Sequence, residues 1–277
     1  MSDLSPEVQI IGHGPYVLCL HSSTSSSKQW RDLVETLSGE FTVVTPDLYG
    51  YGKSPQWDES RPMELQDEID LLRPVLKSIP GPYHLIGHSY GGAVAFRLAS
   101  TEPARVRSLV VYEPVPFNLL FEERDLDSAL EIWLLSDDVN WLLVDGRNAR
   151  AAERFVDYWS GEGAWAALPE WQKKAIEGRM TKVVSDFDAT MGDSTRLNVY
   201  ARLRIPTLFM YGAQSPQPTR RIVEWLGTHL PNVEVRGLLP LGHMGPVTHS
   251  RYVNDLIARF LRGQPSGILP HQIRRAV

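Results

Sequence analysis

The sequence is poor in cysteine: Cys19 is the only one in 277 residues, so no disulfide can form within the chain. It also lacks any block of lysine and arginine, and its formal net charge of −5 offers no electrostatic attraction to nucleic acid or an anionic membrane. No apolar run reaches the roughly 18 residues of a membrane span, and the first residues lack the basic and apolar regions of a signal peptide. We therefore expect a cytoplasmic protein with a small-molecule partner, no nucleic acid and no membrane.

Motifs for metal and phosphate binding are absent as well. No group of His, Cys, Asp and Glu has the spacing of a metal site, and no glycine-rich phosphate loop is present. Cys19 stands inside the apolar run YVLCLH, which predicts a buried strand residue and not a reactive thiol. The sequence therefore predicts a function that needs no metal and no cofactor.

What the sequence does have is an alternation of short apolar runs with longer helical patterns. Runs of four to eight apolar residues bounded by Gly, Pro or Asp are typical of buried strands. Strands separated by helices indicate a doubly wound α/β fold, in which helices cover both faces of a mostly parallel sheet. The expected strands lie within residues 15–21, 41–48, 83–89, 106–113, 205–212 and 233–240, and the expected helices cover 27–37, 63–78, 90–101, 219–230 and 249–262.

The alternation is interrupted once, between Pro114 and about Leu203, where helical patterns follow one another without a strand signal. We expect residues 115–202 to form a helical cap on a core domain made of residues 1–114 and 203–277. Five of the eight tryptophans lie in this segment. They either cover the core of the cap or, in one or two cases, line an apolar pocket over the sheet, for which Trp159 and Trp165 are the candidates.

The stretch YHLIGHSYGGAVAFRLAS carries a chemical motif. A strand pattern is followed by G-x-S-x-G, centred on Ser89, and then by an apolar helix, so that the glycines allow a sharp turn exposing the serine at the carboxyl edge of the sheet. A serine hydroxyl needs an adjacent base to become nucleophilic, and His243 in the loop LPLGHMG is the candidate. Capping or packing explains His249 at the head of the last helix, and packing and hydrogen bonding explain His88 and His84.

Together, the stretches LCLHSS, PDLYGYGKS and GHSYGG, the helical cap and LPLGHMG resemble the α/β-hydrolase superfamily over nearly the whole chain. The resemblance implies a Ser89 nucleophile, a His243 base, and an oxyanion hole made by the backbone N–H groups of Ser23 and Tyr90. It also implies that the cap follows the sixth strand. Where the family usually has a glycine in the first of these stretches, this chain has Ser22, whose backbone has less conformational freedom.

The acid that should support His243 is missing from its usual place. A few residues past the strand written PTLFMYG stands Ser215, and a hydroxyl cannot balance an imidazolium as a carboxylate does. Some members of the superfamily carry the acid after the preceding strand, which ends here in LVVYEP and places Glu113 at its tip. We therefore expect Glu113 to take this role. The weaker candidates are Asp186, Asp188 and Asp47, the last of which also fits a turn-stabilising aspartate.

These residues predict a serine hydrolase that cleaves a small carboxylic ester, lactone or thioester through an acyl-enzyme, with water as the second substrate. A C–C bond hydrolase or an acyltransferase uses the same side chains and stays open. The superfamily's epoxide hydrolases and haloalkane dehalogenases use an aspartate nucleophile, so Ser89 disfavours both. From a different class, Ser215 leaves open a non-catalytic small-molecule binding protein on a hydrolase scaffold.

Overall fold

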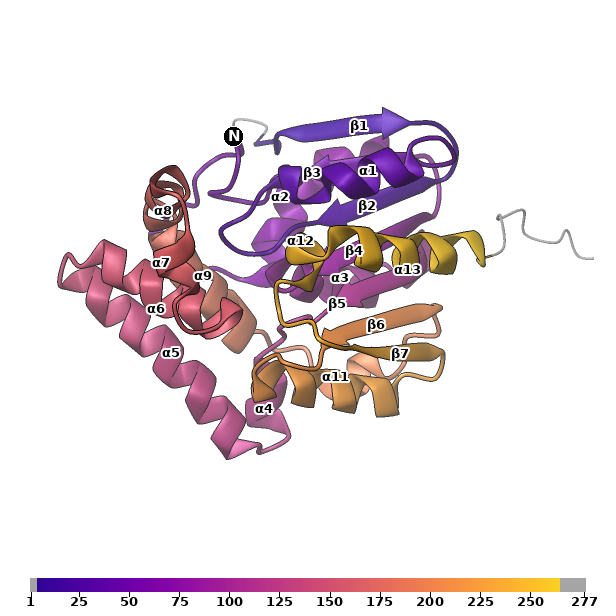
Figure 1. Ribbon diagram of the computed structural model, residues 1–277. Helices are drawn as coiled ribbons and strands as arrows, with labels where there is room; N and C mark the ends of the chain where they lie inside the picture. Colours follow the sequence, from indigo (N-terminus) through magenta and orange to yellow (C-terminus); the bar gives the residue numbers. More distant parts are fainter. Residues whose placement is uncertain (1–3, 265–277) are drawn as a thin grey trace, which may run out of the picture.

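A seven-stranded sheet forms the centre of the molecule in the computed structural model, which describes residues 4–264 (Figure 1). The strand order is β1-β3-β2-β4-β5-β6-β7, and every neighbouring pair is parallel except β1 and β3. The parallel strands are buried because helices cover both faces, which is the doubly wound arrangement expected from the sequence. The strands are Val8–Gly12 (β1), Tyr16–Leu20 (β2), Thr42–Pro46 (β3), Tyr83–His88 (β4), Val106–Tyr112 (β5), Thr207–Gly212 (β6) and Val233–Leu238 (β7).

The antiparallel edge strand β1 is the one strand that the sequence did not predict. It pairs with β3 on one side only, and Ile10 and Ile11 are 52% and 45% exposed. An edge strand that buries neither face gives no run of buried apolar residues, so the pattern that identifies the other strands is missing here.

Two sets of helices cover the two faces of the sheet. The first is α1 (Arg31–Leu37), preceded by a 3₁₀ turn over Ser27–Trp30, together with α13 (Ser250–Arg262), and both pack on Val17, Cys19 and Ile86. The second is α2 (Leu65–Ser78), α3 (Tyr90–Thr101) and α11 (Gln217–His229), which lie in the larger hydrophobic cluster of the opposite face. All five expected helices are therefore present, with ends within two residues of those predicted from the sequence.

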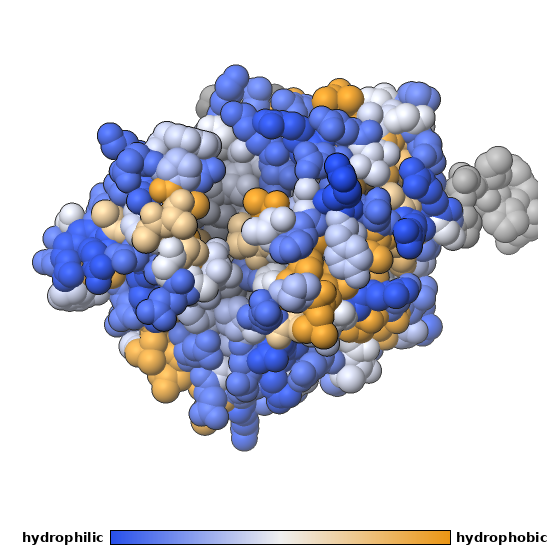
Figure 2. All heavy atoms as spheres, in the orientation of Figure 1, coloured by the Kyte–Doolittle hydropathy of each residue, from blue (hydrophilic) through white to orange (hydrophobic). Residues whose placement is uncertain are grey.

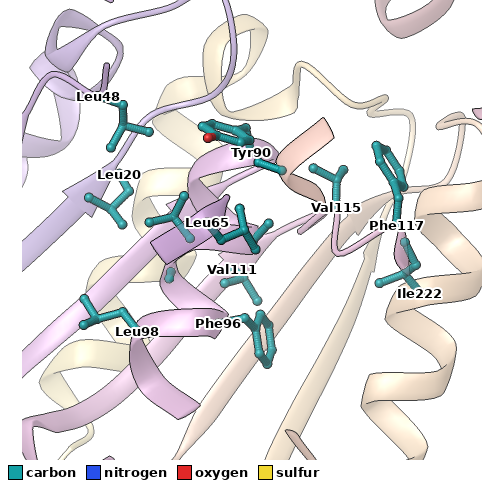
Figure 3. Packing of buried hydrophobic residues seen from close by; sticks show 14 of the residues in the cluster. Leu20, Leu48, Leu65, Tyr90, Phe96, Leu98, Val111, Val115, Phe117 and Ile222 are labelled. Carbon is teal, nitrogen blue, oxygen red and sulfur yellow. The ribbon is translucent and has the colours of Figure 1, made fainter. Parts of the chain in front are cut away.

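The larger cluster contains residues from the sheet, from α3 and from the segment that follows β5. Figure 3 shows Phe96 and Leu98 of α3 packed beside Val111 of β5, with Val115 and Phe117 continuing the same layer. Apolar side chains therefore join the sheet directly to the residues that enter the next segment.

Between β5 and β6 the chain forms a helical insertion, which extends to the left of the sheet in Figure 1. The insertion follows the fifth strand of this chain, whereas the resemblance implied that it follows the sixth. The difference arises because this chain has one strand fewer before the insertion. No strand lies between β5 and β6 among residues 4–264. The helices are α4 (Asn118–Glu122), α5 (Leu126–Val144), α6 (Asn148–Ser160), α7 (Ala164–Ala167), α8 (Glu170–Glu177), α9 (Met180–Met191) and α10 (Leu197–Tyr200).

The tryptophans of the insertion divide into two groups. Trp159 and Trp165 are buried, whereas Trp133, Trp141 and Trp171 are 48%, 58% and 70% exposed. The last three therefore cover no core, and hydrophobic side chains gather on the surface over α5 at the lower left of Figure 2. No helix within residues 4–264 combines the length and the apolar character needed to span a membrane.

Candidate active site

Ser89 lies at a tight turn between β4 and α3. Its backbone has φ 54° and ψ −118°, a conformation that non-glycine residues rarely adopt. A Cβ on Gly91 would lie 2.4 Å from the carbonyl oxygens of Leu20 and His21, and one on Gly87 would lie 2.5 Å from the Gly91 oxygen. Both glycines are therefore needed for close backbone approach, and the turn lifts Ser89 to the end of the sheet as the motif predicts.

Ser89, His243 and Glu113 form one continuous hydrogen-bonded series. Ser89 Oγ lies 2.9 Å from His243 Nε2, and His243 Nδ1 lies 2.6 Å from Glu113 Oε2. The three residues come from the ends of β4 and β5 and from the loop after β7, so only the fold brings them together. With Nδ1–H donating to the carboxylate, Nε2 is left free to accept the serine proton.

Glu113 is fully buried, and its second carboxylate oxygen also has partners. Glu113 Oε1 accepts the backbone N–H of Gly212 at 2.6 Å and a hydrogen bond from Ser215 Oγ. A buried carboxylate needs such donors because it has lost its water. Ser215, which stands where an acid was expected, therefore donates to the acid that comes from the neighbouring strand.

Two free backbone N–H groups lie beside Ser89. Ser23 and Tyr90 line the same cavity as Ser89, and neither backbone N–H donates to any group within residues 4–264. Two unpaired donors next to a nucleophile are the arrangement that binds an oxyanion. Ser22 has no positive φ, so the glycine usual at this position is not required here; the left-handed residue of this loop is Thr24, with φ 60°.

A hydrogen-bonded chain that the sequence did not predict links this loop to the loop of His243. Gln29 Oε1 accepts from the backbone N–H and the hydroxyl of Ser22 at 3.1 and 3.0 Å, and Gln29 Nε2 lies 3.1 Å from His88 Nδ1. His88 Nε2 lies 2.9 Å from the carbonyl oxygen of His243. Burial holds the pKa of His88 well below its usual range, so it stays neutral and can hold both neighbours.

Three further histidines within the described residues make no hydrogen bond to Ser89 or Glu113, and the capping or packing role expected for His249 is absent, because its side chain is exposed and makes no capping hydrogen bond. Burial lowers the pKa of His84 to about 4, and its Nδ1 lies 2.7 Å from Ser108 Oγ. His249 directly precedes α13, and its exposed ring contacts Thr248. His21, buried below the loop of Ser22, donates from Nδ1 to the Ser22 carbonyl and accepts the backbone N–H of Leu48.

The helical insertion supplies most of the wall of the cavity beside Ser89. Its volume is about 20 Å³, room for about one water molecule, and Phe117, Phe155 and Phe187 form its apolar wall. Trp159 of α6 lines it and also stacks on the imidazole of His243, with ring centroids 4.2 Å apart. Val115, a further lining residue, lies between Tyr90 and Phe117 in Figure 3.

Trp165, the other tryptophan predicted at the pocket, does not line this cavity. A turn containing Gly161 and Gly163 separates it from α6, and the backbone N–H of Trp165 donates to Asp157 at 2.7 Å. Its ring lies against Lys173 and the hydrophobic cluster. The turn therefore carries Trp165 away from Ser89, although the two tryptophans are close in sequence.

The three weaker candidates for the acid bond to other groups or are exposed. Asp47 accepts the backbone N–H groups of Ser27 and Lys53, which makes it the turn-stabilising residue that the sequence suggested. Asp188 is exposed on α9. Asp186 lines the cavity but bonds to Ser23, Tyr51 and Lys182, not to His243. The described residues contain no cluster of His, Cys, Asp and Glu that could hold a metal ion.

Comparison with known proteins gives hydrolases among the relatives. A fluoroacetate dehalogenase from Burkholderia sp. is 30% identical over a match covering 48% of this chain and 45% of that protein. A pimeloyl-[acyl-carrier protein] methyl ester esterase from Nitrosomonas europaea is 27% identical over 86% of this chain and 92% of that protein. The crystal structure of an alpha/beta hydrolase from a Medee basin deep-sea metagenome library has the same fold, with a TM-score of 0.78, 16% identity and 96% of both chains covered.

The chain thus spans less than half of the dehalogenase and nearly the whole of the esterase. The match to the family profile covers residues 17–256 and includes the turn of Ser89, the end of β5 and the loop of His243. The chain belongs to the alpha/beta hydrolase family.

Proposed function

We propose that the protein is a serine hydrolase that cleaves a small carboxylic ester, lactone or thioester through an acyl-enzyme. The observation that carries this proposal is the series Ser89 Oγ, His243 and Glu113, with both hydrogen bonds at 2.9 Å or less. A serine, an imidazole and a buried carboxylate in that order are the groups that activate a hydroxyl at neutral pH.

In the proposed reaction, Ser89 Oγ attacks the carbonyl carbon while His243 Nε2 takes its proton. The oxyanion that forms accepts the N–H groups of Ser23 and Tyr90, and Glu113 balances the charge of the imidazolium. His243 then gives its proton to the leaving alkoxide or thiolate. A water molecule, deprotonated by the same imidazole, attacks the acyl-enzyme and releases the acid.

The size of the cavity favours a short acyl group. A volume of about 20 Å³ does not hold a chain such as the pimeloyl group in the name of the Nitrosomonas relative. Longer acyl groups need α6 or α9 to shift, because these helices supply Trp159 and Phe187 to the wall. We therefore propose acetyl-sized acyl groups as the substrates that the closed arrangement accepts.

Ser215 was the reason to consider a non-catalytic binding protein. Its hydrogen bond to Glu113 argues against a binding protein, because the carboxylate comes from the neighbouring strand and Ser215 donates a hydrogen bond to it. A C–C bond hydrolase or an acyltransferase would use the same groups with a different bond or acceptor. These alternatives are separated by products: hydrolysis of an ester to its acid favours the present proposal.

The test uses p-nitrophenyl esters of increasing acyl length together with a fluorophosphonate probe. We expect the parent protein to hydrolyse the acetate and to be labelled at Ser89. Ser89→Ala should fold normally, because the side chain is small and lies at a turn, and should lose turnover by about 10⁴-fold or more. A folded Ser89→Ala variant with the parent rate, or a folded parent that is neither labelled nor active, would refute the proposal.

A further inference from the structure

A buried group of charges lies beside the cavity, which one of its members, Asp186, lines. Lys182 Nζ donates to Glu68 Oε1 at 3.1 Å and to Asp186 Oδ1, and all three residues are 6% exposed or less. Lys182 and Asp186 come from α9 of the insertion, whereas Glu68 comes from α2 of the core. The cluster therefore joins the insertion to the core through charges that have lost their water.

The cluster contacts both residues that line the cavity of Ser89 with an unpaired backbone N–H, Ser23 and Tyr90. Ser23 Oγ donates to Asp186 Oδ2 at 2.5 Å, and Tyr90 OH donates to Glu68 Oε1 at 3.1 Å. The ammonium group of Lys182 lies 4.6 Å from the centre of the Tyr90 ring, a favourable cation–π position. The side chains of Ser23 and Tyr90 are thus both hydrogen-bonded to the same charged cluster.

The loop of Ser23 also has a backbone that needs outside support. Thr24 has φ 60°, which is costly for a β-branched residue and persists only where neighbouring contacts hold it. Arg179, at the start of α9, donates to the Thr24 carbonyl at 2.5 Å. Helix α9 therefore holds this loop at two adjacent residues, by Arg179 on Thr24 and by Asp186 on Ser23.

The cluster is poorly arranged for proton transfer to a substrate. Asp186 Oδ2 already accepts from Ser23 and from Tyr51 OH, the latter at 2.5 Å, and Asp186 Oδ1 accepts from Lys182. Glu68 Oε2 accepts the backbone N–H of Tyr49 at 3.0 Å. Because every carboxylate oxygen has a partner inside the protein, the cluster can hold its neighbours in place but has little capacity left to bind a substrate.

We propose that Asp186 is a positioning residue, which fixes the Ser23 N–H for the oxyanion by holding the Ser23 hydroxyl from helix α9. This inference rests on the proposed function. It means that the oxyanion site is complete only when α9 of the insertion is docked on the core. Substrate entry that displaced α9 would also release Ser23, so that the two-donor site forms as the cavity closes.

The sharpest test is Ser23→Ala, which removes the hydroxyl and leaves the backbone N–H. Ser25→Ala is the matched control, because it deletes a hydroxyl in the same loop whose side chain has no hydrogen bond within the described residues. With p-nitrophenyl acetate, we expect Ser23→Ala to lower kcat by about 10-fold or more, since a displaced donor loses much of its transition-state stabilisation. KM should stay near the parent value, whereas the melting temperature should fall somewhat, because the buried carboxylate of Asp186 loses one of its donors. Ser25→Ala should behave as the parent.

Asp186→Asn tests the hydrogen bond between Ser23 and Asp186 from its other partner. It should lower kcat similarly, and the double variant with Ser23→Ala should be little worse than either single variant, because both remove one interaction. If Asp186→Asn does not fold, the Ser23→Ala result decides alone.

Three outcomes would overturn the inference. They are an unchanged kcat in Ser23→Ala, an effect on KM alone, and fully multiplicative effects of the two changes. In each of them the parent still hydrolyses the ester through Ser89, so the proposed function stands. A folded parent without Ser89-dependent hydrolysis would instead overturn both the function and this inference.

Discussion

At the scale of single residues, the fully buried Glu113 supplies the carboxylate beside His243 that this chain lacks after β6. It reaches His243 from the end of β5, and φ 42° at Glu113 shows that the backbone there is held in an uncommon conformation. The neighbouring strand supplies two donors, Gly212 N–H and Ser215 Oγ. Glu113 at the end of β5 and its two donors at the end of β6 and just after it thus together occupy the place beside His243 that a single aspartate after β6 usually occupies.

Glu113→Gln tests this assignment. The amide keeps the size of the side chain but neither balances the imidazolium nor enforces the tautomer with Nδ1–H, so we expect kcat to fall by roughly 10² to 10⁴-fold. Steady-state hydrolysis of p-nitrophenyl acetate measures the effect, and circular dichroism checks the fold. A folded variant with nearly the parent rate would show that His243 does not depend on Glu113.

Ser215→Ala tests the donor. From the sequence alone this change would matter little, but the hydrogen bond to Glu113 changes that expectation. Removing one donor from a buried carboxylate should cost about 1.5 to 3 kcal/mol in the free energy of unfolding, measured by urea denaturation, with a smaller loss of turnover than in Glu113→Gln. Ser215→Thr, which keeps a hydroxyl, is the control and should retain more stability than the alanine variant. Equal stability of parent and Ser215→Ala would contradict the role of this bond.

At the scale of elements, helix α6 sets the size of the cavity through Trp159. Its ring lies on His243 and beside Phe117, and α6 packs on α5, α7, α8 and α9. Two buried tryptophans six residues apart therefore have different surroundings: both belong to the larger hydrophobic cluster, but only Trp159 lines the cavity.

This difference predicts different results for two alanine variants. Trp159→Ala should enlarge the cavity and raise the ratio of kcat/KM for p-nitrophenyl hexanoate over acetate by roughly tenfold or more. Trp165→Ala should leave that ratio unchanged and lower the free energy of unfolding by about 3 to 5 kcal/mol, because it leaves a void in packed residues. The same shift in acyl preference from both variants would contradict the assignment of Trp159 to the pocket.

At the scale of the whole molecule, buried neutral histidines should make stability depend on pH. Burial lowers the pKa of His21 and of His84 to about 4, whereas an unfolded histidine titrates near about 6.5. The unfolded chain therefore takes up protons that the folded chain cannot, and stability is lost as the pH falls from about 6.5 toward 4. At pH 5 the loss is about 2 kcal/mol for each such histidine. Asp186 and Glu68 act in the opposite sense, because burial raises their pKa.

A single variant isolates the histidine contribution. His84→Asn keeps a polar atom near the place of Nδ1 beside Ser108, and the residue lies near the start of β4, at the opposite end of that strand from the Ser89 turn. Urea denaturation at pH 7 and pH 5 should show a smaller loss of stability in His84→Asn than in the parent, by about 2 kcal/mol. His229→Asn, at an exposed position, should lose as much as the parent. Equal losses in all three proteins would argue against a neutral, buried His84.

The sequence by itself determined the features that depend on neighbouring residues in the chain. The alternation of apolar runs predicted six of the seven strands, and the helix predicted over residues 90–101 is α3. The turn at Ser89 could be predicted because its glycines and its serine are adjacent, so their geometry is a local property. His243 and Glu113 came from the resemblance together with their positions at strand ends, where parallel strands bring side chains to one edge.

Only the tertiary structure decided what distant residues do to one another. Nothing near Ser215 in the sequence indicates that its hydroxyl meets a glutamate 102 residues away, and the same holds for Ser23 and Asp186, which are 163 residues apart. Trp159 and Trp165 are both buried in the larger hydrophobic cluster, yet only Trp159 contacts His243, because a turn separates the two residues. The physical reason is that burial and hydrogen-bond partners depend on which elements pack together, and this packing is a property of the complete fold.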